Sequence, residues 1–380
     1  MKKIAVLGAG SYGTATAYHL AKKYENDANY SICIYARDKK IVEEINRDHT
    51  NKKYTQTPLP HNLVAHDNLQ QAVDKADYTI MGVPAQSMRS VAKELAPIIR
   101  HKTIIINLAK GLEVGSFKRM SQIISEELQA VKHLCSITSL GGPAFSKDIF
   151  AHHPIGVALG GKNNKILHEI RLLFDTETFD VKITKDVIGV ELGGALKNVF
   201  GIMAGIMSGT DMGSSINGDY LTRSIVDMKA IASFMGARRA TLDGRAGLGD
   251  LAITCTEGSR NFRFGREFAK QHQKNSSLPI DELLQNTLEA LNIKTVEGFY
   301  TLDPLYQLCE SINMFVPIVN NLYKMLYKND CSPEEAVHRY RIRDKIRSRE
   351  ARLTISRVLS FLFPRIWYRR ERGFFGVKNL

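Results

Sequence analysis

The fold is decided near the N-terminus, where an apolar run leads directly into three glycines: Lys3-Ile4-Ala5-Val6-Leu7-Gly8-Ala9-Gly10-Ser11-Tyr12-Gly13. The apolar run predicts a buried strand, and residues 12–23 have the spacing of a helix. In a strand–turn–helix unit, Gly8 permits the tight turn, Gly10 lets the backbone approach a pyrophosphate, and Gly13 lets the helix pack on the sheet. The glycine spacing alone is a weak signal, but this setting favours a dinucleotide site over a merely structural turn.

The first half of the chain alternates short β-like runs with helical patterns. Strands are expected at residues 3–7, 30–35, 78–83, 103–107, 134–139, 154–159 and 179–183. Helices are expected at residues 12–23, 39–47, 87–95 and 117–129. Such alternation predicts βαβ units around a parallel sheet, so the fold class is α/β, with a Rossmann-type dinucleotide-binding domain over residues 1–186.

The second half of the chain has a different pattern, in which long helical stretches are separated by glycine-rich turns. These stretches cover residues 187–207, 219–235, 297–310 and 316–326. They predict an all-helical substrate and catalytic domain over residues 187–340. The active site is expected in the cleft where the strand ends face this second domain.

Composition narrows the class of protein. The chain has 380 residues, of which 44% are hydrophobic, enough for two domains with real cores. Its five cysteines form no C-x-x-C pair, and an odd number fits reduced thiols in a cytoplasmic protein. The N-terminal apolar run is too short for a signal peptide, and no stretch approaches the roughly 20 apolar residues that span a bilayer.

The positive charge is concentrated in a C-terminal extension, residues 341–380. This extension carries +9 of the formal net charge of +13, and its basic residues flank an apolar and aromatic stretch. Such a composition over residues 345–372 suits peripheral contact with an anionic membrane surface. The alternatives are a helix packed on the protein or on a partner subunit, and a flexible basic tail. Nucleic acid is disfavoured because the charge lies outside any recognisable binding fold.

The residues after the second predicted strand bear on cofactor preference. An acidic residue there would hydrogen-bond the ribose hydroxyls of NAD, but the order is Ala36-Arg37-Asp38. Arg37 can pair with a 2′-phosphate, which favours NADP. Asp38 can still serve NAD, and a surface arginine beside its own neighbour is the structural alternative.

Three further segments have residues suited to chemistry on an anionic substrate. Lys110 follows the predicted strand 103–107, where ligand-facing residues concentrate. Lys197 lies inside an otherwise apolar helix, where burial lowers a lysine pKa and suits it to proton transfer, unless the side chain reaches the surface. Asp250 can hold such a lysine or serve in a turn. Ser259-Arg260-Asn261 offers donors for a phosphate or caps a helix.

Together these segments resemble the NAD(P)-dependent glycerol-3-phosphate dehydrogenase family in its bacterial form, from residue 2 to about residue 340. The phrases that carry the resemblance are Gly8-Ala9-Gly10-Ser11-Tyr12-Gly13-Thr14-Ala15, Ala109-Lys110-Gly111-Leu112-Glu113, Gly142-Pro143-Ala144-Phe145, Gly189-Val190-Glu191-Leu192-Gly193-Gly194-Ala195-Leu196-Lys197-Asn198-Val199, Ala246-Gly247-Leu248-Gly249-Asp250-Leu251 and Ser259-Arg260-Asn261-Phe262-Arg263-Phe264-Gly265.

The resemblance implies reversible reduction of dihydroxyacetone phosphate by NAD(P)H to sn-glycerol 3-phosphate, which feeds phospholipid synthesis. It implies that Lys197 is the general acid, that Lys110 stabilises the developing charge, and that Asp250 and Thr254 position Lys197. The implied substrate-binding residues are Lys110, Gly142, Asn198, Asp250, Ser259, Arg260 and Asn261. The implied cofactor-binding residues are Gly8, Gly10, Ser11, Tyr12, Gly13, Arg37, Lys110, Gly142, Ala144, Ser146, Arg260, Thr295 and Glu297.

Two departures from the family pattern affect cofactor contacts. Ala144 stands where the family usually has Thr or Ser, so a hydroxyl contact is lost, and Thr295 replaces a usual aliphatic residue. No metal is expected, because no cluster of ligands is apparent and the adjacent His152-His153 pair does not converge on one ion. We expect a homodimer. The rival functions are a related hydroxyacid or opine-type dehydrogenase and a catalytically silent sensor of NAD(P)H.

Overall fold

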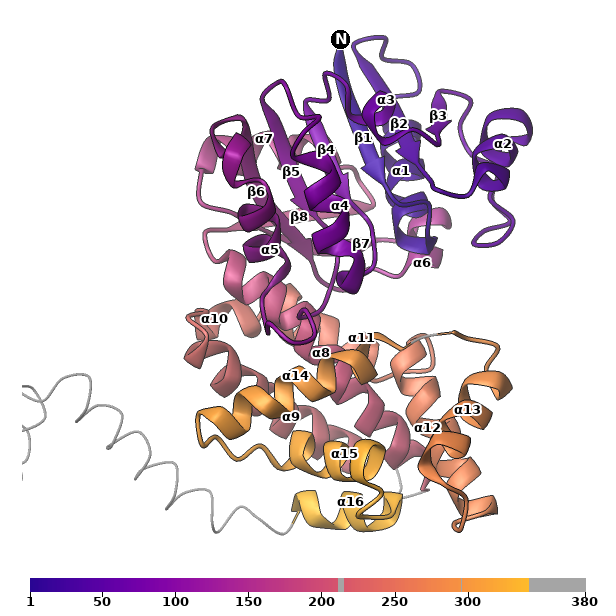
Figure 1. Cartoon of the computed structure of the whole chain (residues 1–380), viewed down its shortest axis with the longest axis vertical. Coiled ribbons are helices and arrows are strands. Elements are labelled where there is room, and N and C mark those ends of the chain that lie inside the picture. Colours follow the sequence, from indigo (N-terminus) through magenta and orange to yellow (C-terminus); the bar gives the residue numbers. More distant parts are fainter. Residues whose placement is uncertain (211–214, 295, 342–380) are drawn as a thin grey trace, which may run out of the picture.

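The computed structural model describes residues 1–210, 215–294 and 296–341. Within them, an eight-stranded sheet with its helices forms one half of the molecule, and a bundle of helices forms the other (Figure 1). The extension beyond residue 341, including the segment 345–372 considered for membrane contact, lies outside the described residues.

The sheet has the strand order β3-β2-β1-β4-β5-β6-β7-β8. The strands are β1 (Lys2–Leu7), β2 (Tyr30–Tyr35), β3 (Leu63–His66), β4 (Tyr78–Met81), β5 (Thr103–Asn107), β6 (Cys135–Gly141), β7 (Ile155–Gly160) and β8 (Phe179–Thr184). The first six strands are parallel and have the order of a dinucleotide-binding fold. Strand β7 runs antiparallel to β6, and β8 runs parallel to β7. The predicted α/β class is therefore confirmed.

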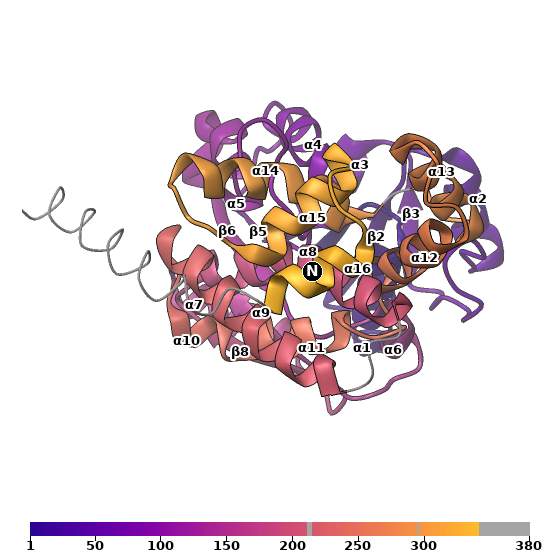
Figure 2. The ribbon, with the colours of Figure 1, turned by 90° about the horizontal axis from the view of Figure 1, so that it is seen from below.

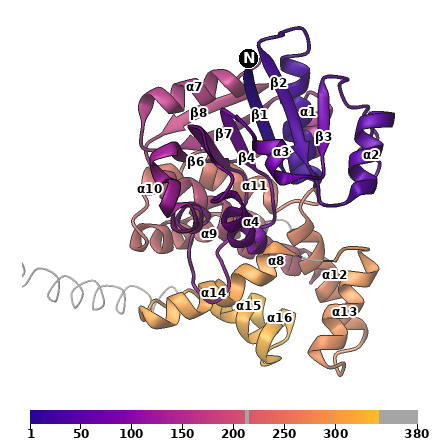
Figure 3. The same cartoon turned by 45° about the horizontal axis from the view of Figure 1, so that its top comes forward.

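Helices cover both faces of the sheet, so its central strands are buried on both sides (Figure 3). These helices are α1 (Ser11–Lys23), α2 (Lys39–Asp48), α3 (Leu69–Val73), η1 (Ala85–Ser87), α4 (Met88–Leu95), α5 (Met120–Glu127), η2 (Gln129–Leu134), α6 (Ser146–Phe150) and α7 (Asn164–Phe174). Ile4 and Val6 of β1 lie in the core shared with α1 and α7, while Ala5 and Leu7 face α4 and α5. A strand buried on both faces explains the continuous apolar run that opens the chain.

The second half is helical, as expected, and is built around one long central helix, α8 (Val187–Gly209). The others are α9 (Ser215–Phe234), α10 (Arg239–Leu242), η3 (Arg245–Gly249), α11 (Asp250–Thr254), α12 (Arg260–Lys274), α13 (Ile280–Ala290), α14 (Glu297–Ser311), α15 (Pro317–Lys328) and α16 (Pro333–Arg341). Viewed from the end opposite the sheet, these helices surround α8 (Figure 2). The strand and α-helices that were not predicted are β3, α3, α6, α7, α10, α11, α12, α13 and α16.

Helix α8 is long and apolar enough to cross a membrane, so the expectation that no stretch approaches that length was wrong, but 89% of its apolar window is buried inside the protein. It is therefore the core helix of the helical domain. Its packing against α12 depends on close backbone approach. A Cβ atom on Gly205 of α8 would lie 1.9 Å from the Phe262 carbonyl oxygen, and one on Gly265 of α12 would lie 2.0 Å from the Ile202 carbonyl oxygen.

This close approach predicts that Gly205→Ala destabilises the protein although alanine favours helices. The added methyl group must push two backbones apart, so we expect a loss of about 1–3 kcal/mol in the free energy of unfolding. Gly218→Ala in α9 is the matched control, because a Cβ there meets no atom within 4 Å. Alanine should leave stability unchanged or raise it by up to about 1 kcal/mol there. Denaturant unfolding measures both variants, and equal stability of the two would contradict this account of the packing.

Candidate active site

The glycine loop joins β1 to α1 and has the shape that a pyrophosphate requires. Gly8 has a φ of 109°, and a Cβ there would lie 2.8 Å from the Gly82 carbonyl oxygen. A Cβ on Gly13 would lie 2.0 Å from the Gly8 carbonyl oxygen, so only glycine lets α1 start this close to the strand. A Cβ on Gly10 meets nothing within 4 Å. The loop is therefore tight on its inner side and open on its outer side, at a helix N-terminus that favours phosphate.

No acidic residue occupies the first turn of α1, and no side chain caps it. Ser11 and Tyr12, the first two residues of α1, are partly exposed at this terminus. The free N–H groups and the positive end of the helix dipole remain available to an anion. The residues present thus fit a dinucleotide.

Asn51 supports the glycine loop from a distant part of the sequence. Its carboxamide is fully buried and donates hydrogen bonds to the Ala9 carbonyl oxygen, at 3.2 Å, and to Thr14 Oγ1, at 2.9 Å. Sequence reasoning missed this residue, because it lies in an irregular segment about forty positions after the loop and no local pattern distinguishes it.

The end of β2 places two charged residues beside each other. Arg37 is exposed and directly precedes Asp38, the N-cap of α2. Asp38 Oδ1 accepts a hydrogen bond from the Lys40 backbone N–H at 3.0 Å. Capping α2 therefore engages Oδ1 of the Asp38 carboxylate, whereas the Arg37 side chain is exposed to solvent.

Two lysines and one aspartate, far apart in sequence, meet between the sheet and the helical domain. Lys110 follows β5, Lys197 lies on α8, and Asp250 begins α11. The Lys197 Nζ–Asp250 Oδ1 distance is 2.5 Å and the Lys110 Nζ–Asp250 Oδ2 distance is 2.7 Å, so each lysine takes one carboxylate oxygen. Lys110 Nζ also donates to the Gly142 carbonyl oxygen at 3.1 Å. The Asp250 side chain is fully buried, which excludes water from these contacts.

Burial and neighbouring charges shift the pKa values of the two lysines in opposite directions. Burial lowers the pKa of Lys197 to about 8, with the nearby Lys110 charge acting in the same direction and Asp250 opposing it. Burial also acts to lower the pKa of Lys110, but the charge of Asp250 and its hydrogen bond outweigh it, so that this pKa lies above its usual value. Lys110 is thus held as a cation, whereas the lowered pKa of Lys197 suits it to donate and accept a proton.

Thr254 lies one turn after Asp250 on α11. Its hydroxyl donates to the Asp250 backbone carbonyl oxygen at 2.6 Å, so it contacts Lys197 only indirectly, through the position of Asp250.

Ser259 is buried as the N-cap of α12, and Arg260 begins that helix with an exposed side chain. The start of α12 therefore offers a guanidinium beside backbone N–H groups, a setting suited to a phosphate.

A row of polar side chains links α8, α12 and α14 on the same side of the site. Asn261 Nδ2 donates to Asn198 Oδ1 at 3.0 Å, and the Gly298 N–H donates to Asn261 Oδ1 at 2.9 Å. Asn198 Nδ2 lies 3.3 Å from Glu297 Oε2. Burial raises the pKa of Glu297, with the charges of Arg260, Lys197 and Lys110 opposing it. The structure therefore brings Asn198, Asn261 and Glu297 together.

The remaining predicted site residues lie around the end of β6. Gly142 has a φ of 128°, Ala144 is buried, and Ser146 begins the short helix α6. Thr295 lies outside the described residues. Over the described parts of the chain, no group of three or more His, Cys, Asp or Glu side chains is placed to hold a metal ion.

Glu191 is a buried charge to which sequence reasoning assigned no role. It lies on α8, six residues before Lys197, and its carboxylate accepts from Arg119 NH1 at 2.6 Å, from Ser121 Oγ at 2.7 Å and from Ser139 Oγ at 2.9 Å. The Ser121 backbone N–H also donates to it at 2.8 Å. This network fixes α8 to β6 and to the start of α5. The sequence signal for this network is a carboxylate within an otherwise apolar helix, since a buried charge needs partners.

The glycine loop and the lysine–aspartate cluster between two domains define a two-domain nicotinamide-dinucleotide oxidoreductase. Comparison with known proteins identifies the family. A family model for the N-terminus of NAD-dependent glycerol-3-phosphate dehydrogenase matches residues 3–167, and one for its C-terminus matches residues 186–338. The chain belongs to this family, and the predicted resemblance is confirmed.

Relatives and solved structures agree over most of the chain. A glycerol-3-phosphate dehydrogenase [NAD(P)+] from Lysinibacillus sphaericus is 35% identical, over 91% of this chain and 98% of its own length. One from Clostridium botulinum is 33% identical over the same shares. The crystal structure of glycerol-3-phosphate dehydrogenase from Coxiella burnetii has a TM-score of 0.79 at 29% identity, covering 89% of this chain and 98% of that one.

Proposed function

We propose that the protein catalyses the reversible reduction of dihydroxyacetone phosphate to sn-glycerol 3-phosphate with NAD(P)H, and so supplies the backbone of glycerophospholipids. Family membership supports the reaction. The observation that carries the mechanism is the buried cluster in which Lys110 and Lys197 share Asp250. One carboxylate between two ammonium groups gives a cationic site, which suits a dianionic phosphate ester and a carbonyl oxygen that becomes negative.

The residues have separate tasks. When bound on the glycine loop, the dinucleotide supplies the hydride that carbon 2 of the substrate receives. Lys197 donates a proton to the carbonyl oxygen, which completes the alcohol, and takes that proton back in the reverse reaction. Lys110 keeps its charge and stabilises the oxygen as it becomes negative. Asp250 holds both ammonium groups, with Thr254 fixing its backbone.

Substrate and cofactor are held by the groups around this cluster. Arg260 and the N-terminus of α12, with Ser259, Asn261 and Asn198 beside it, bind the substrate phosphate. The glycine loop, Ser11 and Tyr12 bind the pyrophosphate end of the cofactor, and Gly142, Ala144, Ser146 and Glu297 make further contacts with the cofactor. The open face of Gly10 supports this assignment.

Turnover with purified protein tests the function and the role of Lys197. We expect dihydroxyacetone phosphate to be reduced with loss of NADPH absorbance, and unphosphorylated dihydroxyacetone to be a far poorer substrate. Lys197→Ala should lower kcat by at least about a hundredfold, the usual contribution of a general acid, while NADPH binding measured by fluorescence stays the same. An inactive wild type would overturn the function, whereas an active Lys197→Ala variant would overturn only the mechanism.

The pKa of Lys197, about 8, predicts opposite pH dependences for the two directions. Reduction needs the protonated lysine, so its kcat/KM should fall as pH rises through about 8. Oxidation of glycerol 3-phosphate needs the neutral amine, so its kcat/KM should rise over the same range. Initial rates in both directions, measured across this range, check the sign, and parallel profiles would rule out a shared proton donor and acceptor.

We further propose a preference for NADP, because Asp38 caps α2 while Arg37 is exposed at the end of β2. Arg37→Ala should raise KM for NADPH about tenfold, as expected for loss of one charge-assisted hydrogen bond, and leave KM for NADH almost unchanged. Paired kinetics with both cofactors measure this. An equal change for both cofactors would show that Arg37 does not contact a 2′-phosphate.

We also propose how the chain is divided and where the protein is located. Residues 1–186 bind the dinucleotide, residues 187–340 supply the substrate site, and residues 341–380 form a separate basic extension. The described cysteines are all free, which supports a cytoplasmic location. We also propose a homodimer. We propose peripheral membrane contact through residues 345–372, which the basic and aromatic composition of this segment supports.

A further inference from the structure

Lys110 stands on an irregular loop, although its charge must be placed accurately. The loop runs from Leu108 to Arg119, between β5 and α5, and an isolated bridge pairs Leu112 with Arg119. Surface loops without regular structure are normally the mobile parts of a protein. Contacts with neighbouring elements must therefore hold Lys110 against Asp250, and one of them is the packing of Leu112, which is fully buried in the core around α8.

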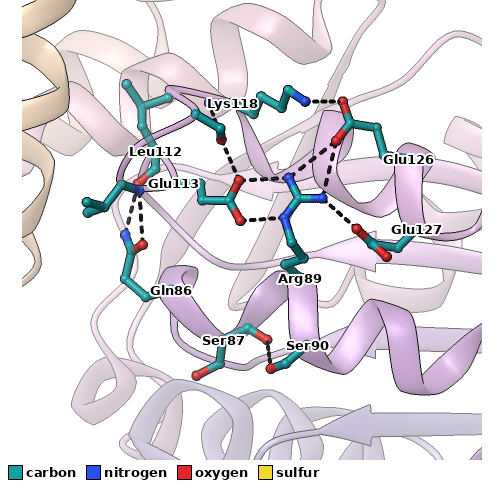
Figure 4. A network of polar contacts seen from close by, with 11 residues as sticks. Gln86, Ser87, Arg89, Ser90, Leu112, Glu113, Lys118, Glu126 and Glu127 are labelled. Atoms are coloured by element: carbon teal, nitrogen blue, oxygen red, sulfur yellow. Dashed lines mark hydrogen bonds and ion pairs between the residues drawn. The ribbon is translucent and has the colours of Figure 1, made fainter.

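The segment that follows β4 contacts this loop at three successive places. Gly111 has a φ of 159°, and a Cβ on it would lie 2.9 Å from the Ala85 Cβ atom, so the two backbones pack closely there. The Gln86 carboxamide donates to the Leu112 carbonyl oxygen at 2.9 Å and accepts from the Val114 N–H at 3.1 Å. One side chain thus satisfies a backbone group on each side of Glu113 (Figure 4).

Arg89, one turn further along, makes the third contact. Its Nε and NH2 atoms each lie 2.7 Å from a different oxygen of Glu113, which is the paired geometry of a strong guanidinium–carboxylate contact. The same guanidinium reaches Glu127 of α5 at 2.5 Å, so Arg89 lies between the Lys110 loop and α5 (Figure 4). On the opposite side, the Lys110 stem lies across α8, where a Cβ on Gly194 would be 3.1 Å from Lys110 Cγ.

We propose that Gln86 and Arg89 are positioning residues for catalysis, because they hold the Lys110 loop so that the Lys110 ammonium meets Asp250 and the substrate oxygen. The inference rests on the proposed function of Lys110. Neither side chain contacts Lys110 itself. Both hold the chain two to four residues after it, Gln86 through the backbone and Arg89 through the Glu113 side chain, so a shift of this segment displaces the ammonium. A displacement of about 1 Å can cost on the order of a hundredfold in rate.

Three glutamates contact Arg89, namely Glu113, Glu126 and Glu127, and Glu113 and Glu127 supply a pair of variants. Glu113 lies on the Lys110 loop and Glu127 lies on α5, and their side chains are 16% and 20% exposed. Each substitution removes one charge from the same arginine, but Glu113 binds it through both oxygens and also accepts from the Ser116 hydroxyl, whereas Glu127 makes one contact. Denaturant unfolding of both variants therefore accompanies the kinetics. E113Q should lower kcat/KM for dihydroxyacetone phosphate about tenfold, because only this change releases the loop. E127Q should behave like the wild type.

The pH profile separates positioning from general loss of structure. The Lys110 charge helps to lower the pKa of Lys197, so moving Lys110 away should shift the falling limb of reduction to higher pH. E113Q should show this shift, and E127Q should not. Gln86→Met, which leaves every charge in place, should show the same shift as E113Q and serves if E113Q fails to fold. Equal kinetics and equal pH profiles for E113Q and E127Q would overturn the proposal.

A measurement without substrate separates this inference from the proposed function. Trace acetylation of the full-length protein, read by mass spectrometry, reports how readily the Lys110 amine reacts. Release from Asp250 should make Lys110 react faster in E113Q and Gln86→Met than in E127Q or the wild type. This ranking is expected even if the wild type does not reduce dihydroxyacetone phosphate, whereas unchanged Lys110 reactivity in E113Q would overturn the inference alone.

Discussion

The active site depends on one carboxylate, that of Asp250, lying between two ammonium groups. Burying a charge is costly unless it is paired, and here each oxygen of a fully buried side chain has its own lysine partner. The pairing also fixes the distance between the two lysines, since both bind the same group. Without the carboxylate, two like charges would face each other in a dry interior, and the site would not assemble.

Helix α8 transmits this constraint to the rest of the molecule. It carries Glu191, Lys197 and Asn198, so its position relative to the sheet sets the place of the proton donor and of the polar row beside it. Glu191 ties it to β6 and α5, while Gly205 allows α12 to approach it closely. A helix packed on all sides in this way has little freedom to move, and its one lysine is held as firmly as its apolar residues.

The sequence predicted those features that local pattern encodes. Strand β1, the glycine loop and the apolar helix around Lys197 each have a periodicity or spacing that indicates their structure, and Lys110 follows a predicted strand. Strand β3 was missed because it has only one β-branched residue and no aromatic one. Asn51, Gln86, Arg89 and Glu191 were not assigned roles because their importance arises from partners far away in the sequence. Asp250 was expected to hold Lys197, but its contact with Lys110 was not predicted, since no local pattern encodes a contact across 140 positions.

The separation of Lys110 and Asp250 along the chain also determines when the active site can assemble during synthesis. The glycine loop is complete once the sheet has formed, but Asp250 emerges much later and reaches Lys110 only when the helices around α8 have packed. Contacts between such distant residues form slowly, because a long segment of chain must first be ordered. A chain that has reached only the end of the sheet therefore has the nucleotide-binding loop but not the carboxylate that holds Lys110 and Lys197 together.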